Sequence, residues 1–187
     1  MKSAILLTTL FFIYGSSFSQ NKFIPDITLN KKVYLLNSGT VIKNLGDQTK
    51  NIYEGEGLPH VTYINNKTKN YVTLYGQPGA NANKFAYFEV GKLSLINDST
   101  GAIHDSKLNS VKTESGICLG LSPSKVKSIK GAPSNQENDN GNLIFEYRLT
   151  MRNAKTFLAR YNMPVYTAKY IFRGNRLVQY SFGFDYP

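Results

Sequence analysis

The sequence contains little of the residues that form disulfides, metal sites and many catalytic sites: one cysteine, two histidines and no tryptophan among 187 residues. A single cysteine, Cys118, excludes an intrachain disulfide, so stability must come from a packed core. Cys118 lies in an apolar string, and we interpret it as a small buried hydrophobic residue. His60 and His104 have no ligand or base partner at a useful spacing, so we predict no metal site, no cofactor and no catalytic residue.

Acidic residues are also scarce, with 12 against 22 basic residues and a net charge of +10. Such an excess favours contact with anionic surfaces: lipid headgroups, lipopolysaccharide phosphates, acidic glycans or an acidic protein. The chain carries no nucleic-acid-binding motif, so nucleic acid is not a predicted partner. The alternative is a basic surface that serves solubility alone.

Long apolar runs are absent except near the N-terminus, where Lys2 precedes the run "AILLTTLFFIY". Small residues follow at Ser17 and Ser19, which is typical of a secretory signal cleaved before Gln20. The run is short for a membrane span of about 20 residues, although a retained anchor is the alternative. No cysteine follows the small residues, so we expect a soluble, exported protein, periplasmic or extracellular, without a lipid anchor.

Residues 20–112 are dense in β-branched and aromatic residues. Short runs of this kind, separated by Asn, Gly, Asp and Pro clusters, predict an antiparallel meander. The predicted strands are "KVYLL", "GTVIK", "HVTYIN", "NYVTLYG" and "KFAYFEVG".

The last of these runs is apolar on nearly both faces, which predicts a central strand or one covered by a helix. Its alternation places two sets of side chains on opposite faces. One set is Phe85, Tyr87 and Glu89, and the other is Ala86, Phe88 and Val90.

Residues 113–187 begin with the stretch "TESGICLGLSPSKVKSIKGAP", which predicts a short helix over Pro123–Lys130. Ser122 is a good N-cap and Pro123 suits the first helical position. Gly131 suits the left-handed position that ends a helix. Val126 and Ile129 form a narrow apolar stripe, while Lys125, Lys127 and Lys130 occupy the other positions. A helix this short forms only if its stripe packs on something, and the strands are the obvious partner.

The remainder of this half alternates strands with one more helix. "SNQENDNGN" reads as a polar loop, "LIFEYRL" as a strand and "MRNAKTFLARYN" as a second helix. "PVYTAKYIF" and "RLVQYSFGF" then form a hairpin through "RGN". One face of this hairpin is an aromatic wall of Tyr166, Ala168, Tyr170, Phe172, Val178, Tyr180, Phe182 and Phe184. The predicted fold class is therefore α+β, with antiparallel strands and one or two short helices on one face.

A resemblance rests on the spacing of glycines, apolar residues and helix-capping residues, followed by the strand "FEY" and a closing hairpin. The residues are Gly116, Ile117, Leu119, Gly120, Ser122, Val126, Gly131 and Pro133, with Phe172, Asn175 and Leu177 at the hairpin. This pattern resembles the small α+β modules of the BamE/SmpA-like outer-membrane assembly lipoproteins and of the β-lactamase inhibitory protein. The resemblance covers Thr113 to Phe184. It implies a short helix packed on a small antiparallel sheet, and a sheet face that binds proteins. The missing lipid-attachment cysteine and the additional helix distinguish this chain from BamE itself.

A weaker parallel links the two halves: "YGQPGANANKFAYFEVG" resembles "KGAPSNQENDNGNLIFEY". Each has Gly-x-Pro, a polar loop and an aromatic strand, which suggests two related repeats. The sequence leaves open whether the halves form one sheet or two repeats.

One stretch invites an enzymatic reading, because "SPSK" at Ser122–Lys125 fits the S-x-x-K nucleophile motif of penicillin-binding enzymes. The companion S-D-N and K-T-G elements are missing, and an N-cap accounts for Ser122. We therefore predict that the protein is not an enzyme, with an unrecognised hydrolase kept as an alternative.

These observations predict an exported, non-enzymatic protein-binding module of a Gram-negative cell envelope, with another envelope protein as its partner. Between residues 142 and 187, seven Lys and Arg stand against two acids, and Tyr and Arg dominate protein–protein interfaces. The candidate partner-binding residues are Arg148, Arg152, Arg160, Tyr166, Tyr170, Arg173, Arg176 and Tyr180. The alternative is a structural envelope component held at the outer membrane by charge. The oligomeric state stays open.

Overall fold

The computed structural model describes residues 23–53, 57–77, 79, 83–96, 102–104 and 110–185. The predicted signal segment, residues 1–19, lies outside the described residues. No helix in the part of the chain that the structure describes has the length and apolar character needed to cross a membrane.

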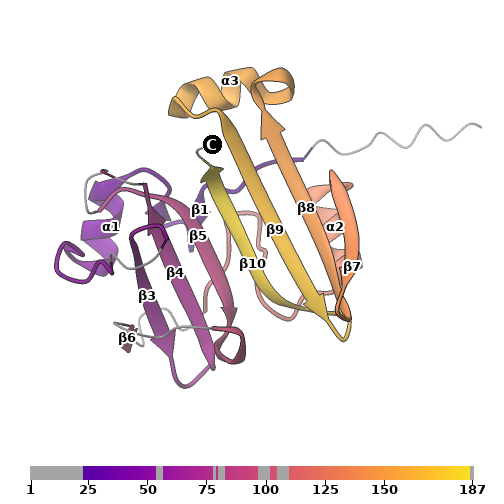
Figure 1. Ribbon diagram of the computed structural model, residues 1–187, viewed down its shortest axis with the longest axis horizontal. Helices are drawn as coiled ribbons and strands as arrows, with labels where there is room; N and C mark the ends of the chain where they lie inside the picture. Colours follow the sequence, from indigo (N-terminus) through magenta and orange to yellow (C-terminus); the bar gives the residue numbers. More distant parts are fainter. Residues whose placement is uncertain are drawn as a thin grey trace, which may run out of the picture.

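The protein is α+β, as the sequence predicts, and its two halves share one eight-stranded sheet (Figure 1). The order across this sheet is β6-β3-β4-β5-β10-β9-β8-β7, and every neighbouring pair is antiparallel except β6, which is parallel to β3. A separate two-stranded sheet joins β1 to β2. The strands are β1 (Thr28–Leu29), β2 (Val33–Tyr34), β3 (His60–Asn65), β4 (Asn70–Gly76), β5 (Phe85–Lys92), β6 (Ile103–His104), β7 (Asn135–Asp139), β8 (Asn142–Thr150), β9 (Val165–Arg173) and β10 (Arg176–Asp185).

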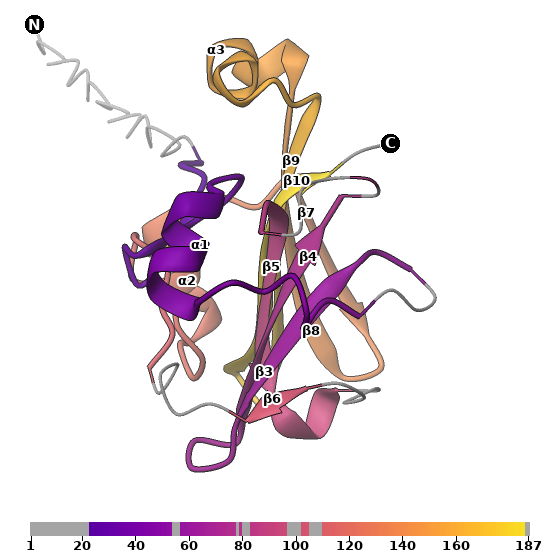
Figure 2. The ribbon, with the colours of Figure 1, turned by 90° about the vertical axis from the view of Figure 1, so that its left-hand side faces the viewer.

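The helices divide the sheet into a covered face and an open face. Both α1 (Ser38–Leu45) and α2 (Pro123–Lys130) lie against the same face (Figure 2), while α3 (Met151–Tyr161) lies beyond one end of the strands (Figure 1). The 3-10 helix η1 (Leu93–Leu95) follows β5. We call the face opposite α1 and α2 the open face, because no α-helix of the described residues lies over it.

The two halves meet at the centre of the sheet, where β5 pairs with β10. From β5 the order outward is β4, β3 and β6, and Tyr53 also bridges to His60 of β3; from β10 it is β9, β8 and β7. Each half also contains an eight-residue helix that is followed by glycine, and the fourth residue of each helix, Val41 or Val126, is fully buried. The sequence parallel between β5 and β8, and with it the suggestion of two related repeats, stays a prediction.

The core lies between the covered face and the two helices. Aromatic side chains of β5, β9 and β10 fill it, including Phe88 and Phe182 in an edge-to-face pair with ring centroids 5.6 Å apart. The aromatic wall predicted for the last hairpin is confirmed, with one change: a bulge after Leu177 turns Leu177 inward in place of Val178.

The segment before α1 is fastened to the segment before α2 by two carboxylates. Asp26 accepts hydrogen bonds from the Ser115 N–H at 3.2 Å and the Ser115 hydroxyl at 3.1 Å. In return, Glu114 accepts from the N–H groups of Ile27 at 2.6 Å and Thr28 at 2.8 Å. Each carboxylate therefore satisfies backbone donors of the other segment.

Asp26 also forms a buried ion pair with Lys130, at the end of α2. The Nζ–Oδ2 distance is 2.6 Å and each side chain is 1% exposed. Burial lowers the pKa of Lys130, and the Asp26 carboxylate opposes that shift. Helix α2 has the predicted bounds, with Ser122 accepting from the Lys125 N–H at 3.3 Å. Lys130, which lies outside the predicted apolar stripe, is nevertheless buried, because the N-terminal segment covers this end of the helix.

Two other local predictions are wrong. "GTVIK" is part of α1 and not a strand, since Asn37 accepts from the Thr40 N–H at 3.1 Å and starts a helix there. "SNQENDNGN" contains β7, a fully exposed edge strand that pairs with β8 through a turn at Asn140 and Gly141. An edge strand needs no apolar face, so its polar composition resembled a loop. Cys118 is half-buried rather than fully buried.

Replacing Lys130 by methionine should lower the free energy of unfolding by about 3–5 kcal/mol, because the Asp26 carboxylate is left buried without its cation. Adding Asp26→Asn should recover much of this loss, which urea unfolding can measure. The exposed Lys125→Met on the same helix is the matched control and should change stability by less than about 0.5 kcal/mol. Additive losses in the double variant would contradict the coupling.

Candidate functional site

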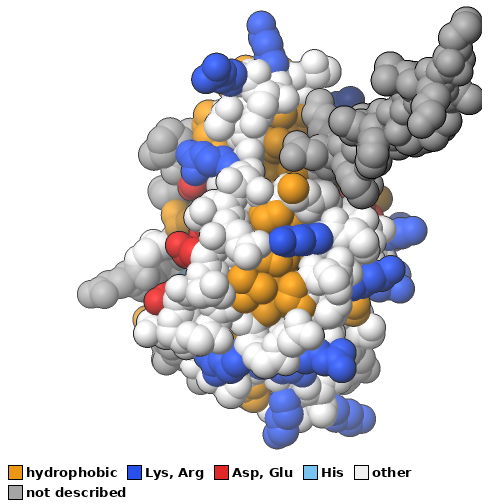
Figure 3. Space-filling view, turned by 90° about the vertical axis from the view of Figure 1, so that its right-hand side faces the viewer, with side chains coloured by type: hydrophobic (Ala, Val, Ile, Leu, Met, Phe, Trp, Pro, Cys, Tyr) orange, Lys and Arg blue, Asp and Glu red, His pale blue; other side chains and the backbone are white. Residues whose placement is uncertain are grey.

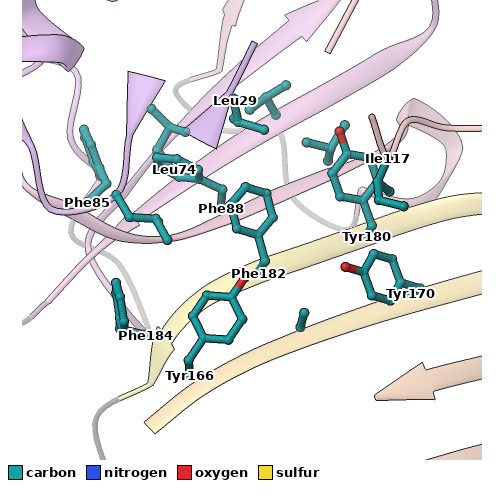
Figure 4. Packing of buried hydrophobic residues seen from close by; sticks show 14 of the residues in the cluster. Leu29, Leu74, Phe85, Phe88, Ile117, Tyr166, Tyr170, Tyr180, Phe182 and Phe184 are labelled. Atoms are coloured by element: carbon teal, nitrogen blue, oxygen red, sulfur yellow. The ribbon is translucent and has the colours of Figure 1, made fainter. Parts of the chain in front are cut away.

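The structure places the three predicted partner-binding tyrosines in the core. Tyr166, Tyr170 and Tyr180 are at most 1% exposed and lie among Phe88, Phe182 and their neighbours (Figure 4). The Tyr166 hydroxyl donates to the Asp26 carbonyl at 2.6 Å, and the Tyr180 hydroxyl donates to the Val111 carbonyl at 3.2 Å. Their prediction as contact residues is therefore wrong: they line the face that α1, α2 and the N-terminal segment cover.

The five predicted arginines are exposed, but the fold separates them. Arg152 and Arg160 lie on α3, whereas Arg173 and Arg176 flank the hairpin turn at the other end of β9, roughly 25 Å away along the strand. Arg148 lies on β8. Lys and Arg side chains are likewise scattered over the side shown in Figure 3, around a hydrophobic patch. The arginines do not form one basic-aromatic patch.

Two of these arginines make contacts within the fold. Arg173 Nε donates to Asn142 Oδ1 at 3.1 Å, and Arg176 Nη1 donates to the Gly120 carbonyl at 3.1 Å. They therefore help to hold the ends of neighbouring segments, independent of any partner.

The open face carries a second set of aromatic side chains that the sequence prediction missed. Cross-strand pairing aligns His60 of β3 with Tyr75 of β4, and Tyr75 with Tyr87 of β5. The ring centroids of successive members are 5.5 Å and 6.1 Å apart, and Tyr53 adds a ring 5.4 Å from His60. We call these four residues the aromatic row.

A groove of about 840 Å³ lies beside the aromatic row on the open face. Strands β3, β4, β5 and β10 form its floor, and the segments around Leu58 and Leu95 contribute the rest of its lining. The lining residues are Tyr53, Gly57, Leu58, His60, Thr62, Tyr71, Thr73, Tyr75, Glu89, Leu95, Ile96 and Gln179.

Hydrogen bonds fix several polar groups of the open face. The Tyr71 hydroxyl donates to Glu89 Oε1 at 2.7 Å, and the hydroxyls of Thr62 and Thr73 are 3.0 Å apart. The carbonyl oxygen of Leu58 can only accept, so His60 Nδ1 donates to it at 2.9 Å. The face thus presents oriented donors and acceptors between aromatic rings, an arrangement suited to binding.

Burial extends the pH range over which the tyrosines of this face stay neutral. It raises the pKa of Tyr75 to about 12, and the charge of Glu89 adds to the shift. Burial likewise raises the pKa of Tyr71, again with a contribution from Glu89, and the pKa of Tyr87. Each hydroxyl therefore acts as a donor and acceptor, not as a phenolate.

Two glycines allow the rings to lie close to the sheet. A Cβ on Gly91 would stand 2.5 Å from the Tyr71 ring, which crosses that position. A Cβ on Gly183 would stand 2.3 Å from the Ala86 carbonyl oxygen and 2.6 Å from Tyr87 Cα. At Gly183 the obstacle is backbone, so strands β5 and β10 require glycine there to pair.

A signal for this face exists in the sequence. His60 and Thr62 share one side of "HVTYIN", and Tyr71, Thr73 and Tyr75 share one side of "NYVTLYG", which gives each strand a face with polar or aromatic residues. In β5, Tyr87 and Glu89 share a face as predicted, but Phe85 lies in the core because a bulge opposite Tyr75 and Gly76 shifts its register. The sequence prediction weighed only charge and aromatic content in the C-terminal half, and so overlooked these strands.

No metal centre is indicated by the described ranges, in which no group of three or more His, Cys, Asp or Glu side chains converges. Comparison of the chain with models of known protein families, with curated protein sequences and with solved structures found no significant match. The site must therefore be interpreted from its own geometry.

Gly183→Ala should lower the free energy of unfolding by at least about 2 kcal/mol, because the added methyl group meets backbone atoms that cannot move without separating β5 from β10. Gly91→Ala should cost less, since the Tyr71 ring can swing aside. Urea unfolding of both variants checks the order. Equal losses, or a larger loss at Gly91, would contradict it.

The stability of the protein should fall as pH rises above 10. The ordinary tyrosine pKa is about 10, whereas the pKa of Tyr75 in the folded protein is about 12. Between these values the folded state keeps a proton that the unfolded chain releases, so rising pH favours unfolding. Tyr75→Phe should make the decline in melting temperature between pH 9 and 11 shallower. An unchanged slope would contradict the shift.

Proposed function

We propose that the protein is an exported, non-enzymatic binding module of the bacterial cell envelope and that it recognises a protein partner through its open face. The observation that carries this proposal is the uncovered aromatic row beside a polar groove. Tyrosine and histidine combine an apolar ring with a polar atom, and such side chains are favoured at interfaces that are exposed until a partner binds.

The dimensions of the open face suit a protein partner. Strands lie about 4.8 Å apart and rise about 3.4 Å per residue, so the antiparallel strands offer a face of roughly 30 Å by 20 Å. Its area, about 600 Å², approaches the roughly 800 Å² that each partner contributes to a typical specific interface. A small ligand in the groove would leave most of this face unused.

Two sequence features support the rest of the proposal. The pattern of residues 1–19 is that of a secretory signal. The resemblance of Thr113–Phe184 to the BamE/SmpA-like and β-lactamase-inhibitory modules implies protein recognition by a sheet face. Two halves that each supply a helix and antiparallel strands to one sheet are also what two such modules in tandem would produce.

The open face, not the arginines, should determine partner capture. The tagged protein, applied to an envelope fraction of the native organism, should retain a partner after low-salt and then high-salt washes, because buried aromatic contacts resist screening. His60→Ser with Tyr75→Ser should lose that partner. Arg173→Glu with Arg176→Glu is the control and should keep it. Direct titration of the purified partner should reproduce this order.

Capture by the His60 and Tyr75 variant at the wild-type level would overturn the proposal. Loss in the arginine variant alone would move the site to the basic ends of the sheet. Retention of lipid only, removed by high salt, would favour the structural envelope component instead. Melting curves of both variants must show folded protein.

A further inference from the structure

The groove differs in charge from the rest of the protein. The chain has a net charge of +10, yet the described residues that line the groove include one carboxylate, Glu89, and no lysine or arginine. Ligands with a positive charge would be repelled by the molecule as a whole, so local attraction at this position depends on Glu89.

Glu89 is held in place without being neutralised. It lies on β5 in register with Thr73 of β4 and Ser181 of β10, which are both uncharged. Its Oε1 accepts the Tyr71 hydroxyl at 2.7 Å, and no lysine or arginine of the described residues lies within 4.0 Å of its carboxylate. By contrast, Glu146 pairs with Lys169 at 3.3 Å.

Two tyrosines lie beside this carboxylate in the groove. Tyr71 and Tyr75 stand two residues to either side of Thr73, the residue of β4 opposite Glu89, and the Tyr71 hydroxyl donates to Glu89 Oε1. A carboxylate beside aromatic rings is an arrangement that binds organic cations, because both attract positive charge. A metal ion would require several carboxylate or carbonyl ligands, whereas Glu89 is the one carboxylate among the described lining residues.

We propose that Glu89, Tyr71 and Tyr75 bind the cationic end of a lysine or arginine side chain of the protein partner. This inference rests on the proposed function and specifies the chemistry of the partner: a basic residue on a protruding segment that enters the groove. Charge complementarity selects this occupant, since an acidic segment would meet Glu89 and an apolar one would leave the carboxylate buried without a partner.

The first test uses small probes and needs no partner. The isotopically labelled protein is titrated with N-acetyl-lysine-N-methylamide and N-acetyl-arginine-N-methylamide at pH 8, with backbone amide shifts of Thr73, Glu89 and Ser181 as the readout. N-acetyl-norleucine-N-methylamide is the uncharged control. At least one cationic probe should bind at least about fivefold more tightly than the norleucine probe.

Glu89→Gln should weaken that cationic probe at least about fivefold, since the amide keeps the size and the Tyr71 contact but loses the charge. Glu146→Gln is the matched control on the same face, because its carboxylate is already paired with Lys169. It should leave probe binding unchanged. Equal binding of the charged and uncharged probes by wild type would overturn the proposal. Equal binding of the cationic probe by wild type and by Glu89→Gln would overturn it as well.

The second test separates this inference from the proposed function. Glu89→Gln should lose affinity for the captured partner at least about fivefold, and Glu146→Gln should not. If Glu89→Gln binds the partner as tightly as wild type while the His60 and Tyr75 variant loses it, the cation site is overturned and the open face stands. If no variant of the open face affects capture, the proposed function fails, and the probe titration alone decides what Glu89 binds.

Discussion

The buried ion pair between Asp26 and Lys130 joins the N-terminal segment to the end of α2, beside the hydrogen bonds of Asp26 and Glu114. Asp26 belongs to a segment without long strands of its own, and Lys130 ends a helix of eight residues that would not form alone. A charge buried without its partner is costly, so the segment, α2 and the Ser115 turn can only be buried together. This constraint closes the covered face over the aromatic core.

Closure of one face determines what the other face can do. Because α1, α2 and the N-terminal segment all lie on the same side, no α-helix of the described residues covers the second side of the sheet. A sheet buried on one face usually has a simply polar opposite face. Here that face carries ordered rings and a groove, held by Tyr71, Thr73 and Glu89 and by the close approach that Gly91 and Gly183 permit. Those features exceed what solubility requires, and they support recognition.

Much of the fold could be predicted from local patterns. The cap at Ser122 with Gly131 located α2, and alternation located β3, β4, β5, β8, β9 and β10. The failures have local causes. Asn37 starts a helix in a β-branched stretch, and β7 needs no apolar residue at a sheet edge. The candidate site was harder to predict, because Tyr71, Tyr75 and Glu89 become neighbours only through the pairing of β4 with β5.

The sequence by itself determined where most elements begin and end, since caps, turns and two-residue alternation act within a few residues of the chain. It also determined the α+β class and the aromatic wall of the last hairpin. Only the tertiary structure decided which tyrosines are buried, that Lys130 lies inside, and that Glu89 pairs with no lysine or arginine of the described residues. Tyr180 and Tyr87 both lie in aromatic strands, and the side of the sheet that α1 and α2 cover is what separates a core residue from a residue of the open face.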